Sequence, residues 1–286
     1  MLLAEFIRRG TARLETLYPS PEARGLVLML CGERLGVARY THIIEPLTTV
    51  PPELEEVLEA DLERLCTGEP IQYVLGVAEF CDRRFAVGPG VLVPRPETEG
   101  LVAEGIRFLR ENATDEPPRV LDLCTGSGCI AWSVALEIRD ADVVGVDLSE
   151  TALAYAREQF PGETAGPRFV QADVLDTEQD FPFGPFDLIL SNPPYILEQE
   201  RELLRPNVRD FEPAEALFVA DGDPLLFYRA IARWAQRFLR EGGAGVVEIN
   251  ETLGAETAGV FRDAGFKNVQ ILRDFFGKER FIRFDA

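Results

Sequence analysis

The chain has 286 residues, of which 46% are hydrophobic, and its 49 acidic and 29 basic residues leave a formal net charge of −20. This length allows two domains with a substantial core, whereas so acidic a surface repels nucleic acid phosphates. No stretch reaches the roughly 20 apolar residues of a membrane span, and the charged, short N-terminus is unlike a signal peptide, so we expect a cytoplasmic protein without membrane contact.

The first part of the sequence has the periodicity of helices. Apolar residues recur every three or four positions between residues 54 and 65, after a Pro-Pro start and before Gly68. Residues 2–14 and 26–30 mark two earlier helices. We therefore expect a small helical domain over residues 1–75 and a linker, formed as a hairpin, over residues 76–92. Periodicity alone leaves open whether this domain recognises a partner or only stabilises the protein.

A strand, a Gly-rich loop and a helix are predicted next. Residues 119–123 have the pattern of a short buried strand, and the loop consists of Cys124, Thr125, Gly126, Ser127 and Gly128. An apolar helix follows from residue 129. Glycines let the main chain approach a ligand closely, and the helix N-terminus offers unpaired N–H groups to an anionic group. The loop is therefore a candidate cofactor site.

Acidic residues follow the next two predicted strands. Asp147 comes directly after the strand at 142–146, where a carboxylate can accept hydrogen bonds from ribose hydroxyls. Asp173, followed by Val174, comes after the strand at 168–171, where an acid can meet an adenine amino group. Ordinary turn chemistry at strand ends is the alternative for these acids and for Asp122.

The glycine spacing also fits an NAD site. Gly126-x-Gly128-x-x-Ala131, with Asp147 following 19 residues after Gly128, satisfies the dinucleotide-binding fingerprint. The loop by itself therefore does not separate a dehydrogenase from another nucleotide-binding enzyme.

The segment Asn192-Pro193-Pro194-Tyr195 follows the apolar strand at 186–191. A residue before proline is restricted to extended conformations, and proline has a fixed φ, so this segment is stiff. The Asn192 amide oxygen and the Pro193 carbonyl oxygen can accept both hydrogens of one NH2 group, and Tyr195 can lie against a flat substrate. This pattern predicts methyl transfer to an amino nitrogen. The alternative is a Pro-rich turn at the end of a strand.

The C-terminal part completes an α/β domain. Helices are predicted over residues 225–239 and 256–264, and a buried strand over 245–249. Two strands, over 269–274 and 280–284, surround Gly277 and Lys278. A closing hairpin implies a mixed sheet, whereas a dehydrogenase half would continue in parallel units.

From about residue 70 onward the sequence resembles the HemK/PrmC family, the peptide-chain release factor N(5)-glutamine methyltransferases. The most family-specific segment is Pro94-Arg95-Pro96-Glu97-Thr98-Glu99. The other motifs that carry the resemblance are residues 70–76, 79–80, 89–93, the Gly-rich loop, 191–196, 211–213 and 216–217. The resemblance implies a Rossmann-like class I methyltransferase domain over residues 93–286, with a seven-stranded mixed sheet. The donor would be S-adenosyl-L-methionine, and the acceptor the glutamine of the Gly-Gly-Gln motif in release factors.

The resemblance also implies the roles of individual residues. Asn192, Pro193 and Tyr195 would be catalytic, and substrate binding would add Pro194, Arg95 and Glu97. The cofactor would contact Asn192 and a further set of residues: Cys124, Thr125, Gly126, Ser127, Gly128, Asp147, Asp173 and Val174. The family usually has glycine at two positions, occupied here by Cys124 and Asn250. The five cysteines and His42 form no zinc pattern, so we expect no metal; a monomer is also expected.

Three other functions remain to be distinguished. Asn-Pro-Pro-Tyr also occurs in adenine and guanine amino methyltransferases, which act on DNA or rRNA, but the acidic charge argues against them. An NAD oxidoreductase would bind NAD rather than S-adenosylmethionine. A non-catalytic binding module would transfer no methyl group.

Overall fold

Apolar side chains at helical spacing form the core of the first of two units in the computed structural model, which describes residues 1–163 and 165–286. This unit comprises Met1–Val77 and the segment Arg205–Phe211. Its helices are α1 (Leu3–Leu14), α2 (Ser20–Leu35), α3 (Thr41–Ile44), α4 (Pro52–Cys66), α5 (Ile71–Leu75) and α9 (Pro206–Arg209). The three predicted helices are confirmed as α1, α2 and α4, although α2 is much longer than expected.

One ion pair lies among the apolar contacts of this unit. Arg34 of α2 donates to the nearly buried Asp61 of α4 at 2.7 Å and to the carbonyl oxygen of Val74 at 2.9 Å. A charge-assisted bond of this kind satisfies a carboxylate that would otherwise be costly to bury. It also joins α2, α4 and the end of α5.

A hairpin follows, with β1 (Val77–Phe80) pairing with β2 (Arg83–Ala86). Its two connecting residues, Cys81 and Asp82, have φ values of 48° and 56°. Positive φ at both central residues matches the twist of a two-residue hairpin, although Asn-Gly is the usual sequence there.

The second unit comprises Ala78–Leu204 and Glu212–Ala286, and its centre is a seven-stranded mixed sheet in the order β10-β11-β9-β6-β3-β4-β5. The strands are β3 (Arg119–Leu123), β4 (Asp142–Asp147), β5 (Arg168–Gln171), β6 (Phe186–Ser191), β9 (Leu239–Glu248), β10 (Lys267–Arg273) and β11 (Glu279–Asp285). Strands β5, β4, β3, β6 and β9 are parallel, and β11 is antiparallel to both β9 and β10. The predicted α/β fold with a mixed sheet is confirmed.

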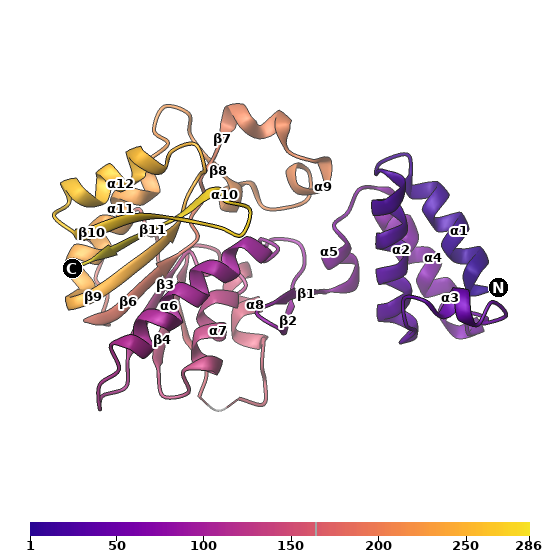
Figure 1. Ribbon diagram of the computed structural model, residues 1–286, viewed down its shortest axis with the longest axis horizontal. Helices are drawn as coiled ribbons and strands as arrows, with labels where there is room; N and C mark the ends of the chain where they lie inside the picture. The colour runs from indigo at the N-terminus through magenta and orange to yellow at the C-terminus, as the bar shows by residue number, and fades with distance from the viewer. Residues whose placement is uncertain (164) are drawn as a thin grey trace. The chain divides into compact units, whose positions relative to one another are not determined.

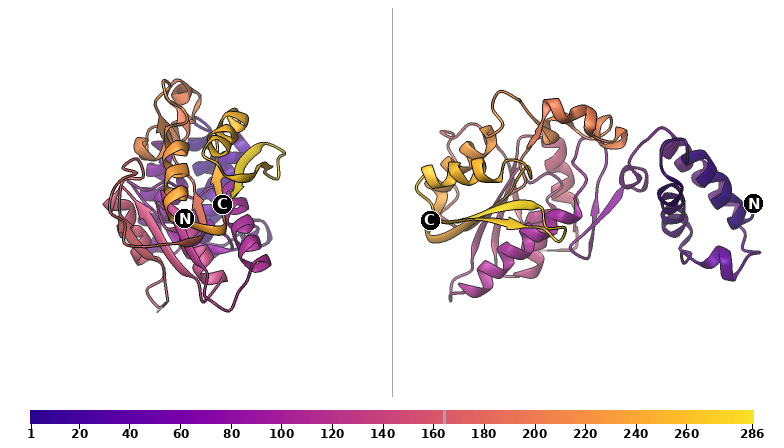
Figure 2. Two further views of the ribbon diagram at one scale, coloured as in Figure 1. Left: turned by 90° about the vertical axis from the view of Figure 1, so that its left-hand side faces the viewer. Right: turned by 45° about the horizontal axis from the view of Figure 1, so that its top comes forward.

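Alternation along the strands distributes the core over both faces of the sheet. Leu121 and Leu123 pack on one face with α11 (Leu226–Phe238) and α12 (Gly254–Asp263). Val120, from the same strand, packs on the other face with α6 (Glu99–Glu111) and α7 (Cys129–Glu137). Figures 1 and 2 show the resulting layers of helix, sheet and helix in this unit. Both faces of the parallel strands are therefore buried, as their continuous apolar sequences require.

The structure corrects the expected start of one strand and adds two helices. Strand β9 begins at Leu239 rather than at residue 245, because Leu239 pairs with Phe186 before the register shifts. Helix α6 and helix α8 (Glu150–Glu158) were not anticipated.

Short elements complete this unit. They are η1 (Pro96–Thr98), η2 (Glu198–Leu203), α10 (Ala214–Leu217) and the two-stranded sheet of β7 (Ile196–Leu197) with β8 (Phe218–Val219). Across the described residues, every helix is too short or too polar to cross a membrane.

Candidate active site

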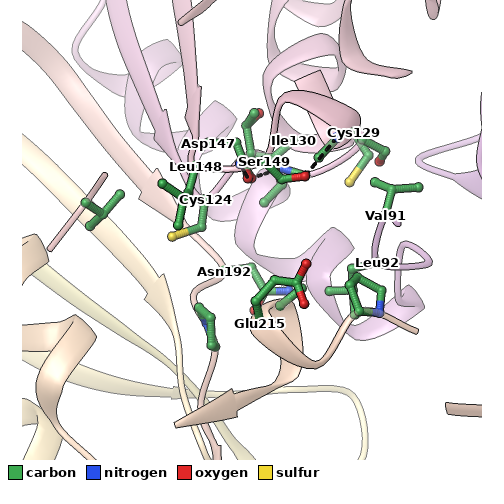
Figure 3. Close-up of a pocket in the computed structure, with 18 of the residues that line it drawn as sticks. Val91, Leu92, Cys124, Cys129, Ile130, Asp147, Leu148, Ser149, Asn192 and Glu215 are labelled. Carbon is green, nitrogen blue, oxygen red and sulfur yellow. Dashed lines mark hydrogen bonds between the residues drawn. The ribbon is translucent and has the colours of Figure 1, made fainter. Parts of the chain in front are cut away.

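The strand order creates a site where β3 and β6 lie side by side. From β3 the chain adds β4 and β5 in one direction, and then β6 and β9 in the other. The connections therefore diverge at the carboxyl ends of β3 and β6, which is where open α/β sheets bind ligands. A cavity of about 310 Å³ lies at this edge. Figure 3 shows Asp147 and Ser149 on one side of it, with Asn192 and Glu215 across from them.

The Gly-rich loop enters the cavity in an unusual backbone conformation. Cys124, Gly126 and Gly128 have φ values of 60°, 56° and 77°. A Cβ atom at Gly126 would meet nothing within 4 Å, whereas one at Gly128 would lie 3.0 Å from Ala156 Cβ. The two glycines therefore serve different needs: Gly126 leaves space in the cavity, and Gly128 allows α7 and α8 to pack closely.

A buried carboxylate beneath the loop holds it to α7. Asp122 is fully buried, and its Oδ2 atom accepts hydrogen bonds from Thr125 Oγ1 at 2.5 Å and from the Ala131 N–H at 3.1 Å. Burial raises the Asp122 pKa to about 7, against the opposing effect of these two bonds, and the nearby Asp147 charge raises it further. Asp122 thus supports the loop from below rather than lining the cavity.

Asp147 faces the cavity from the end of β4. Its Oδ2 accepts from the Gly126 N–H at 2.8 Å, and its Oδ1 accepts from the Ser149 N–H at 2.9 Å. Burial raises the Asp147 pKa, while these backbone bonds oppose the rise. Each carboxylate oxygen has two lone pairs, so both can still accept a ligand hydroxyl. Asp173 is similar, since its Oδ1 accepts from the Leu175 N–H at 2.8 Å while the residue lines the cavity.

Asn192 lies across the cavity, at the end of β6. Its Nδ2 atom donates to Thr98 Oγ1 at 3.3 Å, and Thr98 in turn donates to Glu248 Oε2 at 2.7 Å. Tyr195 donates its hydroxyl to the other oxygen of Glu248 at 2.9 Å. Pro193 and Pro194, between them, are buried. Thr98 and Glu248, for which the sequence indicated no role, therefore connect Asn192 and Tyr195.

Arg95 lines the cavity but is already paired. Its Nη2 atom donates to Glu212 Oε1 at 2.6 Å, and Glu212 Oε2 also accepts from the Val93 N–H at 3.0 Å. Glu212 is nearly buried, so this pair fixes the segment before α6 to the chain preceding α10. Glu97 is half-buried and is not part of the cavity wall. Its charge helps to raise the Glu248 pKa, after the larger effect of burial.

Most of the residues predicted from the sequence meet in this one cavity. Those that line it are Arg95, Cys124, Thr125, Gly126, Ser127, Asp147, Asp173, Val174, Asn192 and Pro194. Gly128, Pro193, Tyr195 and Glu97 lie outside its wall. Side chains and backbone that the sequence did not single out for a role complete the lining, among them Val91, Leu92, Thr98, Ile130, Leu148, Ala152, Glu215 and Phe227. Thr98 stands inside the recognised 94–99 motif, which was the available signal.

The wall of the cavity suits a nucleoside with a polar tail. Apolar side chains such as Ile130 and Phe227 could cover a flat base, and carboxylates at two strand ends could accept from its hydroxyl and amino groups. Within the described ranges, no three His, Cys, Asp or Glu side chains gather closely enough to hold a metal ion.

The chain is similar to several known proteins. A profile described as PrmC N-terminal domain matches residues 5–76, and one described as Methyltransferase domain matches residues 120–209. The release factor glutamine methyltransferase of Bacteroides thetaiotaomicron is 39% identical over 280 residues, covering 98% of each chain. The protein of the same name from Neisseria gonorrhoeae is 41% identical over 263 residues, covering 92% of each. A solved methyltransferase from Pyrococcus furiosus is 17% identical, with a TM-score of 0.47 over 70% of this chain and 87% of its own.

Proposed function

Because this chain belongs to the family of release factor glutamine methyltransferases, we propose that it methylates the glutamine of the Gly-Gly-Gln motif in a translation release factor. The methyl group comes from S-adenosyl-L-methionine and goes to the side-chain amide nitrogen. The observation that carries the proposal is the position of Asn192, at the wall of a nucleoside-sized cavity, with its Nδ2 atom bound to Thr98. Its Oδ1 atom is then the group left to accept from a substrate NH2.

The cavity wall provides contacts for each part of the cofactor. Asp147 would hold the ribose hydroxyls, and Asp173 with Val174 would hold the adenine. The loop from Cys124 to Gly128, together with Asn192, would hold the methionine part. Support comes from the free space at Gly126, where a side chain would otherwise occupy the cavity. When bound, S-adenosylmethionine supplies an electrophilic methyl group on a sulfonium sulfur.

The protein's part in the reaction is to prepare the nitrogen. Asn192 Oδ1 and the Pro193 carbonyl oxygen would accept the two hydrogens of the glutamine NH2 group. Two acceptors on one NH2 group oppose conjugation of its lone pair and point that lone pair at the methyl carbon. The nitrogen–carbon bond would form as the carbon–sulfur bond breaks, which would leave a neutral thioether, and the nitrogen would release one proton to water. No strong base is needed in the ground state, which suits a site built from acceptors.

Two features favour a protein over a nucleic acid as substrate. The net charge of −20 opposes contact with phosphates. In addition, Phe275 and Phe276 are 94% and 78% exposed at the turn between β10 and β11. Strand β10 runs in the same direction as β9, so this turn lies at the carboxyl edge of the sheet, as Asn192 does. Exposed aromatic side chains at such an edge suit contact with another protein.

The proposal extends to the organisation of the chain. Residues 1–75 would help to hold the release factor, residues 76–92 would link the domains, and residues 93–286 would carry the chemistry. The match of residues 5–76 to the PrmC N-terminal domain supports this division. We further propose that the enzyme acts as a monomer in the cytoplasm, where release factors work, without touching nucleic acid.

A transfer assay with labelled S-adenosylmethionine tests the proposal. We expect label on the Gly-Gly-Gln glutamine of a purified release factor, located by peptide mass spectrometry. A release factor with that glutamine replaced by alanine should take up no label, and neither should double-stranded DNA or rRNA. Deleting residues 1–75 should abolish most of the activity while cofactor binding persists. Efficient methylation of DNA or rRNA, with none of the release factor, would refute the proposal.

A further inference from the structure

A chain of hydrogen bonds leads from Asn192 to a buried carboxylate. Thr98 and Glu248 are only 2% and 1% exposed, so water does not compete for their hydrogen bonds. The bonds run from Asn192 Nδ2 to Thr98 Oγ1 at 3.3 Å, and from Thr98 Oγ1 to Glu248 Oε2 at 2.7 Å. Tyr195 reaches the same carboxylate through its hydroxyl, at 2.9 Å from Oε1. The Glu248 carboxylate is therefore linked to both ends of the Asn192–Tyr195 segment, to Tyr195 directly and to Asn192 through Thr98.

While Glu248 is ionised, only one assignment of donors and acceptors fits these hydrogen bonds. A carboxylate only accepts hydrogen bonds, so Thr98 must give its single hydroxyl proton to Glu248. The Thr98 oxygen can then only accept from Asn192. As a result, Asn192 must turn its NH2 group toward Thr98, which leaves Oδ1 as its free end.

We propose that Glu248 and Thr98 are positioning residues, which fix the orientation of the Asn192 amide so that Oδ1 accepts from the substrate NH2 group. This inference rests on the proposed function, because it assigns a purpose to the direction in which Asn192 points. We call the two hydrogen bonds from Asn192 to Thr98 and from Thr98 to Glu248 the relay. Without the relay, the Asn192 amide could turn over and present its two N–H donors to a substrate NH2 group that also donates. Such an arrangement would oppose the reaction rather than assist it.

The groups around Glu248 act on the pKa of its carboxyl group in opposite directions. Burial is the largest influence and raises the Glu248 pKa, while the bonds from Thr98 and Tyr195 and the positive charge of Arg280 lower it. Glu97 acts in the opposite direction. Arg280 is itself held by Asp274, whose Oδ2 lies 3.0 Å from its Nε atom. Burying a carboxylate costs free energy even when it accepts two hydrogen bonds, and packing alone does not require a carboxylate. A role in orienting Asn192 therefore accounts for Glu248 better.

Shape and polarity can be separated by substitution. Thr98→Val keeps the side-chain shape and removes the hydroxyl, whereas Thr98→Ser keeps the hydroxyl. Glu248→Gln keeps the shape of Glu248 but replaces one acceptor by a donor, so either Thr98 or Tyr195 must reverse its bond. Thr257→Val is a matched control, because Thr257 is also fully buried and its hydroxyl has no hydrogen-bond partner among the described residues.

The test compares kcat, KM for the release factor and the cofactor Kd in these variants, with Asn192→Ala as reference. We expect Thr98→Val to lower kcat about 10-fold or more, while KM and Kd stay within about twofold. Glu248→Gln should lower kcat less, because Tyr195 can reverse its bond in place of Thr98. Thr98→Ser should retain most of the activity and Thr257→Val all of it. In an Asn192→Ala background, Thr98→Val should have no further effect, because the oriented group is already gone.

The outcomes separate this inference from the proposed function. If Asn192→Ala impairs turnover but Thr98→Val does not, or if the two effects multiply, the relay is refuted and the role of Asn192 stands. If Asn192→Ala keeps normal turnover, the proposed role of Asn192 fails and the relay fails with it. Should Glu248→Gln not fold, the two Thr98 variants still decide the question.

Discussion

Asn250 donates from its side-chain amide to the backbone carbonyl oxygen of Tyr195, at 3.3 Å. The same Nδ2 atom donates to Glu200 Oε2 at 3.1 Å, and Oδ1 accepts from the Thr252 N–H and hydroxyl at 3.0 and 2.7 Å. Asn250 is not among the residues with positive φ, so a need for a left-handed backbone does not explain it. The Asn250 side chain therefore ties the end of the Asn192–Tyr195 segment to the loop after β9.

Asn250→Gly should therefore destabilise the protein and lower its turnover rate. Loss of these bonds in a nearly buried position should cost about 1–3 kcal/mol of unfolding free energy, measured by urea denaturation. Turnover should fall a few-fold, because the Tyr195 carbonyl loses a restraint. Asn268→Gly is the control, since Asn268 is exposed and already has a φ of 48°, and it should change stability by less than about 0.5 kcal/mol. Equal effects of both substitutions would contradict this account.

Asn192→Ala tests the acceptor role directly. Turnover should fall by roughly 10²- to 10³-fold, the usual effect of losing one preorganised polar contact. The Kd for S-adenosylmethionine, measured by calorimetry, should change far less. Asn112→Ala, in an exposed residue at the end of α6, should leave both quantities unchanged. A variant that turns over at the normal rate would remove Asn192 from the chemistry.

Asp147→Ala should weaken the binding of S-adenosylmethionine by about ten- to a hundredfold, equivalent to roughly 1.5–3 kcal/mol from charge-assisted bonds to the ribose. The fold should survive with some loss of stability, because Asp147 also accepts from the Gly126 and Ser149 N–H groups. Circular dichroism checks the fold, and Asp176→Ala, after the neighbouring strand β5, controls for loss of one negative charge. An unchanged Kd in the folded variant would move the ribose elsewhere.

Asp122 should make stability depend on pH in a defined direction. Its pKa is raised from 3.8 to about 7 in the folded protein, so between these values the native state binds a proton that the unfolded state has lost. Stability from this group is thus fully present below about pH 4 and decreases as the pH rises to about 7. Relative to Asp122→Asn, the cofactor-free wild type should lose stability from pH 5 to pH 7 and then level off. A constant difference across that range would show that Asp122 is ionised throughout.

Cys124→Gly should stabilise the protein. Cys124 has a φ of 60°, which is costly for a residue with a Cβ atom and free for glycine. The gain should be up to about 1 kcal/mol, reduced by the greater freedom of glycine in the unfolded chain. Cys124→Ala separates the two contributions, because it removes the thiol and keeps the strain. If alanine stabilises as much as glycine does, the thiol and not the backbone is the cause.

The residues at the carboxyl ends of strands could be predicted because their signals are local. Asp147, Asp173 and Asn192 each follow a predicted strand, and parallel strands bring such ends to one edge. The Gly-rich loop could be predicted for the same reason. The antiparallel end of the sheet could also be predicted, from the two runs of strand-forming residues on either side of Gly277.

The partners of these residues could not be predicted because they are distant in the chain. Thr98 meets Asn192 across 94 positions and Glu248 across 150, and Arg95 meets Glu212 across 117. The residues next to Glu248 do not show whether its carboxylate accepts a hydrogen bond from Thr98 or is only a charged group at the end of a strand. Only the packing of α6 against β6 and β9 brings them together.

The order of the strands also affects how the protein is made. Strand β11 lies between β9 and β10, yet a ribosome synthesises β10 first. Until β11 emerges, β10 has no neighbour to join, and β9 presents an open edge that includes the buried Val246 and Val247. Unpaired apolar edges are where chains associate wrongly. The nascent chain is therefore most vulnerable to aggregation in the interval between the synthesis of these two strands.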